Sequence, residues 1–294
     1  MLHWPFVRFA PVVFVVLWST GFIVARYGTA DSGPITFLAI RVTIAAVILW
    51  ALSRRVKEAS LTPREKLIQM VSGLGIHGLY LGGVFVAIDL GLPSGVSALI
   101  AALHPVVTTV CGRVLLREDM NQRRIWGVVL GCVGVVVVVV ERGGATHSVR
   151  IGALVAMAVA VVGMSAGTLM QRQFAISTPL LGGTAWQYFA SAVVFSIGAL
   201  FFESWNFSVT AQSIGALAWS VGVLSLGAIL IMLWLLKRQA ASQVSSLFFL
   251  TPALSTIQGS LLFGESLGAL SLLGLVVALL GVWLATSVSH AAST

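Results

Sequence analysis

The stretch LHPVVTTVCGRVLLRE, residues 103–118, places a histidine and a proline inside an otherwise apolar run that ends at a glutamate. Proline removes a backbone donor and histidine carries a polar ring, so both are costly in a long buried helix. A related stretch, LTPALSTIQGSLLFGE, occupies residues 250–265. The costly proline therefore occurs twice, in a similar setting.

The two stretches align at a single offset of 147 residues, half the length of the chain. The offset joins six pairs of identical residues, which are Leu103 and Leu250, Pro105 and Pro252, Gly112 and Gly259, Glu118 and Glu265, Gly127 and Gly274, and Gly134 and Gly281. Such a register indicates an internal duplication. We therefore expect two repeats, residues 1–145 and 146–294.

Composition indicates a membrane protein, because 58% of the residues are hydrophobic and only 9% are charged, against about 25% charged in soluble domains. The apolar residues form segments of about 20 residues, long enough to cross a bilayer as helices. The sequence predicts an all-α fold with ten transmembrane helices near residues 9–27, 34–53, 67–89, 93–116, 124–141, 151–172, 181–202, 213–236, 240–263 and 267–288.

The orientation of the spans follows from the distribution of basic residues. Most of the 17 Lys and Arg residues fall on the side of the N-terminus, whereas only Arg26, Arg142 and Arg150 lie at the opposite ends of the spans. The positive-inside rule then places both termini in the cytoplasm. Because each repeat holds an odd number of spans, the second repeat crosses in the opposite sense, which predicts an inverted repeat typical of secondary transporters.

The paired prolines are candidates for bends or gates. Pro105 cannot donate to the carbonyl of Ala101, and Pro252 cannot donate to that of Phe248. Freed carbonyls at mid-membrane depth are tolerated beside a polar cavity or with substitute donors. The alternative is a kink that serves helix packing only.

Several longer motifs, taken together, resemble the drug/metabolite transporter superfamily, in the branch built from two EamA domains. They are LWSTGFIVARYG, ALHPVVTTVCGRVLLRED and GVVLGCVGVVVVV, with FLTPALSTIQGSLLFGES and LLGLVVALLGVWL in the second half. The resemblance implies a ten-helix transporter of the bacterial inner membrane with a central cavity between the repeats. The most similar type is the aromatic amino acid exporter of the YddG kind, which implies export of aromatic and other neutral amino acids such as methionine by alternating access. Multidrug carriers and nucleotide-sugar or other metabolite carriers of the superfamily are the alternatives.

Polar and large residues near the middle of spans are the candidates for substrate binding, because intramembrane polar groups usually face the bundle interior. His77 and Tyr80 lie three residues apart on one helix face. The remaining candidates are Trp18, His104, Trp186, Thr251 and Gln258, with Trp234 as a further aromatic residue that also suits the membrane interface. For His77 and His104 the alternative is a satisfied hydrogen bond between helices.

Charged residues are scarce inside the spans. Arg41 could hold a substrate carboxylate, but an ion pair with Asp31 or Asp89 is the favoured interpretation. The acidic residues Asp89, Glu118, Glu141, Glu203 and Glu265 all lie at span ends. We therefore expect no obligatory proton coupling through a carboxylate, while coupling through histidine stays open.

Other classes of function are less consistent with the sequence. The formal charge of +8 falls between spans rather than on one soluble face, so we expect no nucleic-acid partner. We expect no metal site, no cofactor, and function as a monomer with a small-molecule substrate in the lipid bilayer. GMSAG, residues 163–167, matches the G-x-S-x-G motif of hydrolases, but an apolar helix is the wrong context, and close helix packing explains its glycines. An intramembrane enzyme is the remote alternative.

Overall fold

The computed structural model describes residues 9–116, 121–145, 150–174, 178–229, 231, 235, 250–265 and 268–286. These residues form helices and their connections, without a strand. Within the described ranges, eight helical spans are long and apolar enough to cross a membrane, from Ala10–Thr29 to Ala211–Ala228. The prediction of an all-α membrane protein is therefore confirmed.

Six helices run without a change of geometry within their bounds. They are α1 (Ala10–Thr29), α2 (Pro34–Arg55), α7 (Gln122–Ala145), α8 (Ile151–Phe174), α13 (Thr251–Phe263) and α14 (Ala269–Thr286). The predicted spans at 213–236 and 240–263 lie partly outside the described residues. The single residues Glu118, Trp234 and Phe248 also lie outside them. Residues 1–8 and 287–294 also lie outside them, so the cytoplasmic placement of both termini stays a prediction.

The other spans change geometry along their length. π-helical turns join α3 (Pro63–Gly73) through η2 (Leu74–Leu79) to α4 (Tyr80–Asp89), and extend α9 (Leu180–Gly198) by η3 (Ala199–Glu203) and α10 (Ala211–Trp219) by η4 (Ser220–Ala228). The predicted span at 93–116 divides into α5 (Ser94–Ala101) and α6 (His104–Leu116). π-helical turns are frequent at functional sites, and residues of η2 and η4 line a cavity of the bundle.

The third span begins four residues before its predicted start at residue 67. Pro63 occupies the first turn of α3, where its missing N–H costs nothing. Thr62 and Glu65 form a capping box, in which the Glu65 carboxylate accepts from the Thr62 backbone N–H at 2.7 Å. These polar residues extend the helix beyond the apolar run, and hydrophobicity alone could not reveal that extension.

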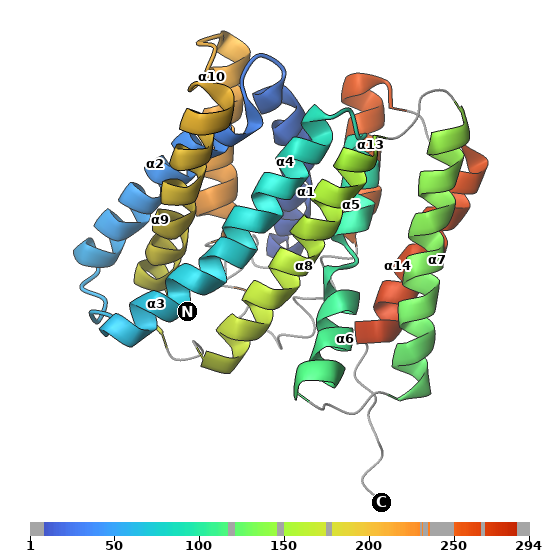
Figure 1. Cartoon of the computed structure of the whole chain (residues 1–294), viewed down its shortest axis with the longest axis horizontal. Coiled ribbons are helices and arrows are strands. Elements are labelled where there is room, and N and C mark those ends of the chain that lie inside the picture. Colours follow the sequence, from blue (N-terminus) through green and yellow to red (C-terminus); the bar gives the residue numbers. More distant parts are fainter. Residues whose placement is uncertain are drawn as a thin grey trace, which may run out of the picture.

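Helices α7 and α14 pack side by side on one side of the bundle (Figure 1). A Cβ atom added to Gly127 would lie 2.3 Å from the backbone nitrogen of Ala285, and one added to Gly134 would lie 2.4 Å from that of Ala278. The two helices therefore run antiparallel with their backbones in contact, a geometry that small residues permit in membranes.

Helices α2 and α9 pack together on the other side of the bundle (Figure 1). A glutamate that follows each of these helices caps the N-terminus of the other. The Glu203 carboxylate, which follows α9, accepts from the backbone N–H groups of Ile35 at 3.0 Å and Thr36 at 2.7 Å. The Glu58 carboxylate, which follows α2, accepts from those of Leu181 at 3.1 Å and Gly182 at 2.8 Å. Acidic side chains at span ends thus satisfy the unpaired donors of helix N-termini.

Candidate functional site

One cavity, called the main cavity here, lies between α1, α2, η2, α4, α8, α9 and η4 and has a volume of about 80 Å³. Aromatic rings form much of its wall, namely Trp18, Phe22, Tyr80, Phe85 and Tyr188. A second, smaller pocket shares Trp18, Phe22, Tyr80 and Met164 with the first, so the two adjoin. It extends the site toward the break between α5 and α6 and the start of α13.

The structure brings most of the predicted site residues to these two pockets. Trp18, His77 and Tyr80 line the main cavity, and the second pocket adds His104, Pro105 and Thr251. The Thr251 hydroxyl is buried and has no hydrogen-bond partner among the described residues.

Three predicted residues lie elsewhere. Gln258 donates from Nε2 to the Ser19 hydroxyl at 2.9 Å and joins α13 to α1. Pro252 is buried in the first turn of α13. Trp186 lines a separate groove between α2 and α9 together with Trp50, because it projects from the face of α9 opposite to the cavity.

His77 lies in η2 and links the cavity to a chain of amide side chains. Its Nε2 is 3.0 Å from Gln187 Oε1, and Gln187 in turn donates to Gln69 Oε1 at 2.5 Å. The His77 ring stacks on Tyr188 with centroids 4.2 Å apart. Because an amide oxygen only accepts, Nε2 carries the proton in this arrangement. The ring is thereby fixed in orientation at the cavity wall.

His104 provides the substitute donor that the proline requires. The break between α5 and α6 comes immediately before His104 and Pro105. The His104 Nδ1 atom lies 3.1 Å from the carbonyl oxygen of Ala101, which Pro105 cannot reach as a donor. The histidine thus satisfies the freed carbonyl, and the proline marks a real interruption of the span.

Arg41 reaches the main cavity from α2 and is only 5% exposed. Its Nε donates to the Ser225 hydroxyl at 3.3 Å, and its guanidinium carbon lies 6.0 Å from the centre of the Phe85 ring. The favoured prediction of an ion pair with Asp31 or Asp89 is wrong, since neither carboxylate lies within ion-pair distance of Arg41. The helix directs Arg41 inward rather than toward the membrane surface.

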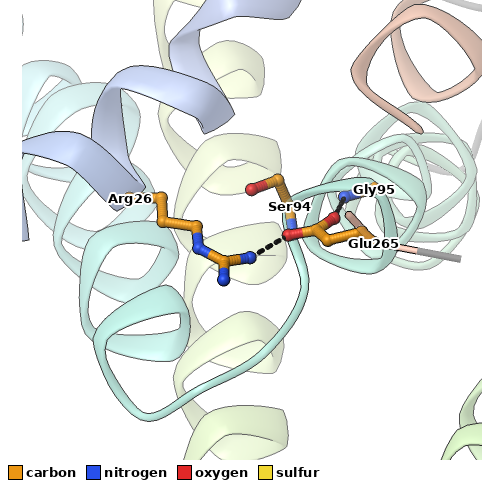
Figure 2. A network of polar contacts seen from close by, with 4 residues as sticks. All are labelled: Arg26, Ser94, Gly95 and Glu265. Carbon is orange, nitrogen blue, oxygen red and sulfur yellow. Dashed lines mark hydrogen bonds and ion pairs between the residues drawn. The ribbon is translucent and has the colours of Figure 1, made fainter. Parts of the chain in front are cut away.

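A polar network ties α1, α5 and α13 together at the end of the site where Arg26 lies, and Figure 2 shows its members. The Glu265 carboxylate pairs with Arg26 and accepts from the backbone N–H of Ser94 at 3.0 Å. It also accepts from Gly95 N–H at 3.4 Å, so it caps the N-terminus of α5. A Cβ on Gly259 would lie 2.5 Å from this carboxylate, which explains why a glycine precedes the glutamate by six residues.

The G-x-S-x-G match lies inside the continuous helix α8, as predicted. The Ser165 hydroxyl lies 2.8 Å from the Val161 carbonyl and 2.9 Å from that of His104. A Cβ on Gly167 would lie 2.6 Å from the backbone oxygen of Ser72, so the glycine permits close packing of α3 on α8. The serine joins α8 to α6 and lacks the turn that a nucleophile of this motif requires.

Tyr188 and Ser225 were missed by reasoning from the sequence. Tyr188 is 2% exposed and stacks on His77, while Ser225 binds Arg41. A signal for Tyr188 was present, because it follows Gln187 in the middle of an apolar span, where two polar residues together indicate the bundle interior. Serine in η4 gave no comparable signal, since it is common in transmembrane helices.

The sequence matches the model of the EamA-like transporter family over residues 9–140 and 150–287. It is 22% identical to a protein of Salmonella typhimurium named "Probable amino-acid metabolite efflux pump", covering 94% of this chain and 93% of the relative. It is 28% identical to an "S-adenosylmethionine/S-adenosylhomocysteine transporter" of Chlamydia muridarum over 44% of this chain and 40% of that one.

A solved crystal structure shares the fold with a TM-score of 0.65, at 19% sequence identity and with 94% of each chain covered. The likeness thus extends over nearly the whole chain.

Proposed function

Because the chain belongs to the EamA-like transporter family, we propose that it exports aromatic and other neutral amino acids, such as methionine, by alternating access through the main cavity. The observation that carries this proposal is the cavity itself, with aromatic walls and a few fixed polar groups. Such walls suit an aromatic or aliphatic side chain, and the polar groups suit the shared part of an amino acid. Similarity to an amino-acid metabolite efflux pump along most of the chain supports the same class of substrate.

The paired contacts support ten helices arranged as two inverted repeats. Gly127 packs on Gly281 while Gly134 packs on Gly274. The offset of 147 relates Gly127 to Gly274 and Gly134 to Gly281, so each contact joins one residue to the repeat counterpart of the other. Reciprocal contacts of this kind arise when two similar units are related by a two-fold axis. The mutual capping by Glu58 and Glu203 has the same reciprocity.

With both termini in the cytoplasm, the network around Arg26 and Glu265 lies at the outer end of the site. We place the protein in the bacterial inner membrane as a monomer, because the cavity is complete within one chain. Pro105 at the break between α5 and α6, and its counterpart Pro252 at the start of α13, serve as gates. Opening toward the outside requires the Glu265 network to separate. Transport by inverted repeats proceeds by such rocking about a central site.

The alternative substrates differ from amino acids in charge. Nucleotide sugars require several cations around the phosphates, and Arg41 is the one charged side chain among the described residues that line the main cavity. Cationic drugs would meet the same arginine as a repulsive charge. Part of the chain is similar to a transporter of S-adenosylmethionine, so larger amino-acid derivatives should also be tested as substrates.

The proposal is tested by counterflow in liposomes with phenylalanine, methionine, S-adenosylmethionine, nucleosides, nucleotide sugars and cationic drugs. We expect phenylalanine or methionine to give a signal, and His77→Ala to reduce it several-fold per folded molecule, because the variant removes a fixed polar group from the cavity wall. Trp186→Phe is the control, since Trp186 lines the separate groove. A signal from cationic drugs alone would favour the multidrug alternative.

A second prediction concerns the outer closure. Glu265→Gln removes the charge that pairs with Arg26 and caps α5, so we expect the outward-open state to become more populated. The measurement is the rate at which an impermeant maleimide added outside labels Gly21→Cys, a cavity position with room for a side chain, after Cys111 and Cys132 are replaced by serine. Faster labelling is expected.

Glu65→Gln is the matched control for that experiment, because Glu65 caps α3 and has no contact with the network. An unchanged labelling rate in Glu265→Gln would contradict the assigned closure.

A further inference from the structure

Arg41 is a buried cation in the wall of the main cavity. It lies seven residues after the start of α2, or about 10 Å along the helix, and is 5% exposed. No carboxylate among the described residues lies within ion-pair distance of its guanidinium group. A charge buried in a membrane protein is costly, and such residues usually mark a substrate or ion pathway.

The protein provides hydrogen-bond acceptors for only some of the N–H donors of this guanidinium group. Among the described residues its one hydrogen bond runs from Nε to the Ser225 hydroxyl, at a long 3.3 Å. Phe85 offers its ring at 6.0 Å, a weak attraction for a cation. An arginine has five N–H donors, so both terminal nitrogens keep their donors for another acceptor.

The other residues of the cavity wall indicate which kind of molecule carries the acceptor for Arg41. Apart from Arg41 the described lining residues are uncharged or histidine, and aromatic and aliphatic side chains form most of the wall. We propose that Arg41 binds the carboxylate of the transported molecule, while its apolar body lies among the rings near Trp18 and Tyr80. A guanidinium group matches a carboxylate with two parallel hydrogen bonds, which a lysine could not do. This inference rests on the proposed function and narrows the substrate to molecules with a free carboxylate.

The test compares each amino acid with its amide, which keeps the amine and the side chain but lacks the negative charge. In liposomes containing the full chain, methionine and phenylalanine are expected to compete at least about tenfold more strongly than methioninamide and phenylalaninamide, the range of a hydrogen bond between charged groups. In Arg41→Gln the preference for the acid should disappear. Arg113→Gln, which removes an exposed arginine of α6 outside the cavity lining, should retain it.

The outcomes separate this inference from the proposed function. If the wild-type protein transports neither amino acid, the proposed function fails and this inference fails with it. If it transports them but is inhibited equally by acids and amides, Arg41 does not bind the carboxylate, although amino acid transport stands. That comparison needs no variant, so it decides even if Arg41→Gln does not fold. A folded Arg41→Gln that keeps the preference would also overturn the inference.

Discussion

Gly134→Leu is expected to leave almost no folded protein. A Cβ at this position would lie 2.4 Å from the backbone nitrogen of Ala278 and 2.5 Å from the backbone oxygen of Gly274. Backbone atoms cannot move aside as a flexible side chain can, so α7 and α14 would have to separate along their length. Overpacking of this kind costs about 1–3 kcal/mol when side chains can adjust, and here they cannot. The measurement is the yield of monodisperse protein in detergent and its melting temperature.

Gly215→Leu is the matched control, because a Cβ on Gly215 in α10 meets no atom within 4 Å. It should purify at nearly the wild-type yield. Gly134→Ala should fall between the two, since one methyl group demands a smaller separation. If Gly134→Leu purified and melted like the wild-type protein, α7 and α14 would not be in backbone contact.

The sequence predicted the helical class and most span positions, because these follow from hydrophobicity. It missed the capping functions of Glu58 and Glu203. Each carboxylate caps a helix more than a hundred residues away in the chain, and such a contact leaves no local pattern. The start of α3 was also missed, since a capping box extends a helix through polar residues.

The site was predicted in part for a similar reason. Histidine and aromatic residues in mid-span are conspicuous, and His77, Tyr80 and Trp18 do line the main cavity. The face of a helix that meets the cavity is set by packing, however, and Trp186 lies on a different face. For Arg41 the sequence predicted an ion pair with Asp31 or Asp89 at the membrane surface. The structure shows instead that the side chain points into the bundle and is buried.

Pro105→Ala and Pro252→Ala are expected to slow transport strongly and leave the folded yield unchanged. Restoring an N–H at residue 105 lets it donate to the Ala101 carbonyl, so α5 and α6 can join into one helix and the His104 ring loses its partner. Alanine is about 3 kcal/mol more favourable than proline in a helix interior. If transport passes through the bent helix, straightening it would slow the rate by up to about a hundredfold.

Pro63→Ala separates this effect from the general loss of a proline. Pro63 lies in the first turn of α3 and follows Thr62, whose backbone is extended, whereas Leu250 before Pro252 has helical backbone angles. Restoring the N–H at residue 63 therefore joins no helix to α3, and this variant should transport at the wild-type rate. Initial rates of counterflow, normalised to folded protein, provide the comparison. Normal rates in both Pro105→Ala and Pro252→Ala would mean that the two prolines serve packing alone. Slow transport in only one of the two variants would assign the gate to one repeat. The two prolines differ in their neighbours, since His104 beside Pro105 satisfies the freed carbonyl, whereas Pro252 is preceded by Thr251.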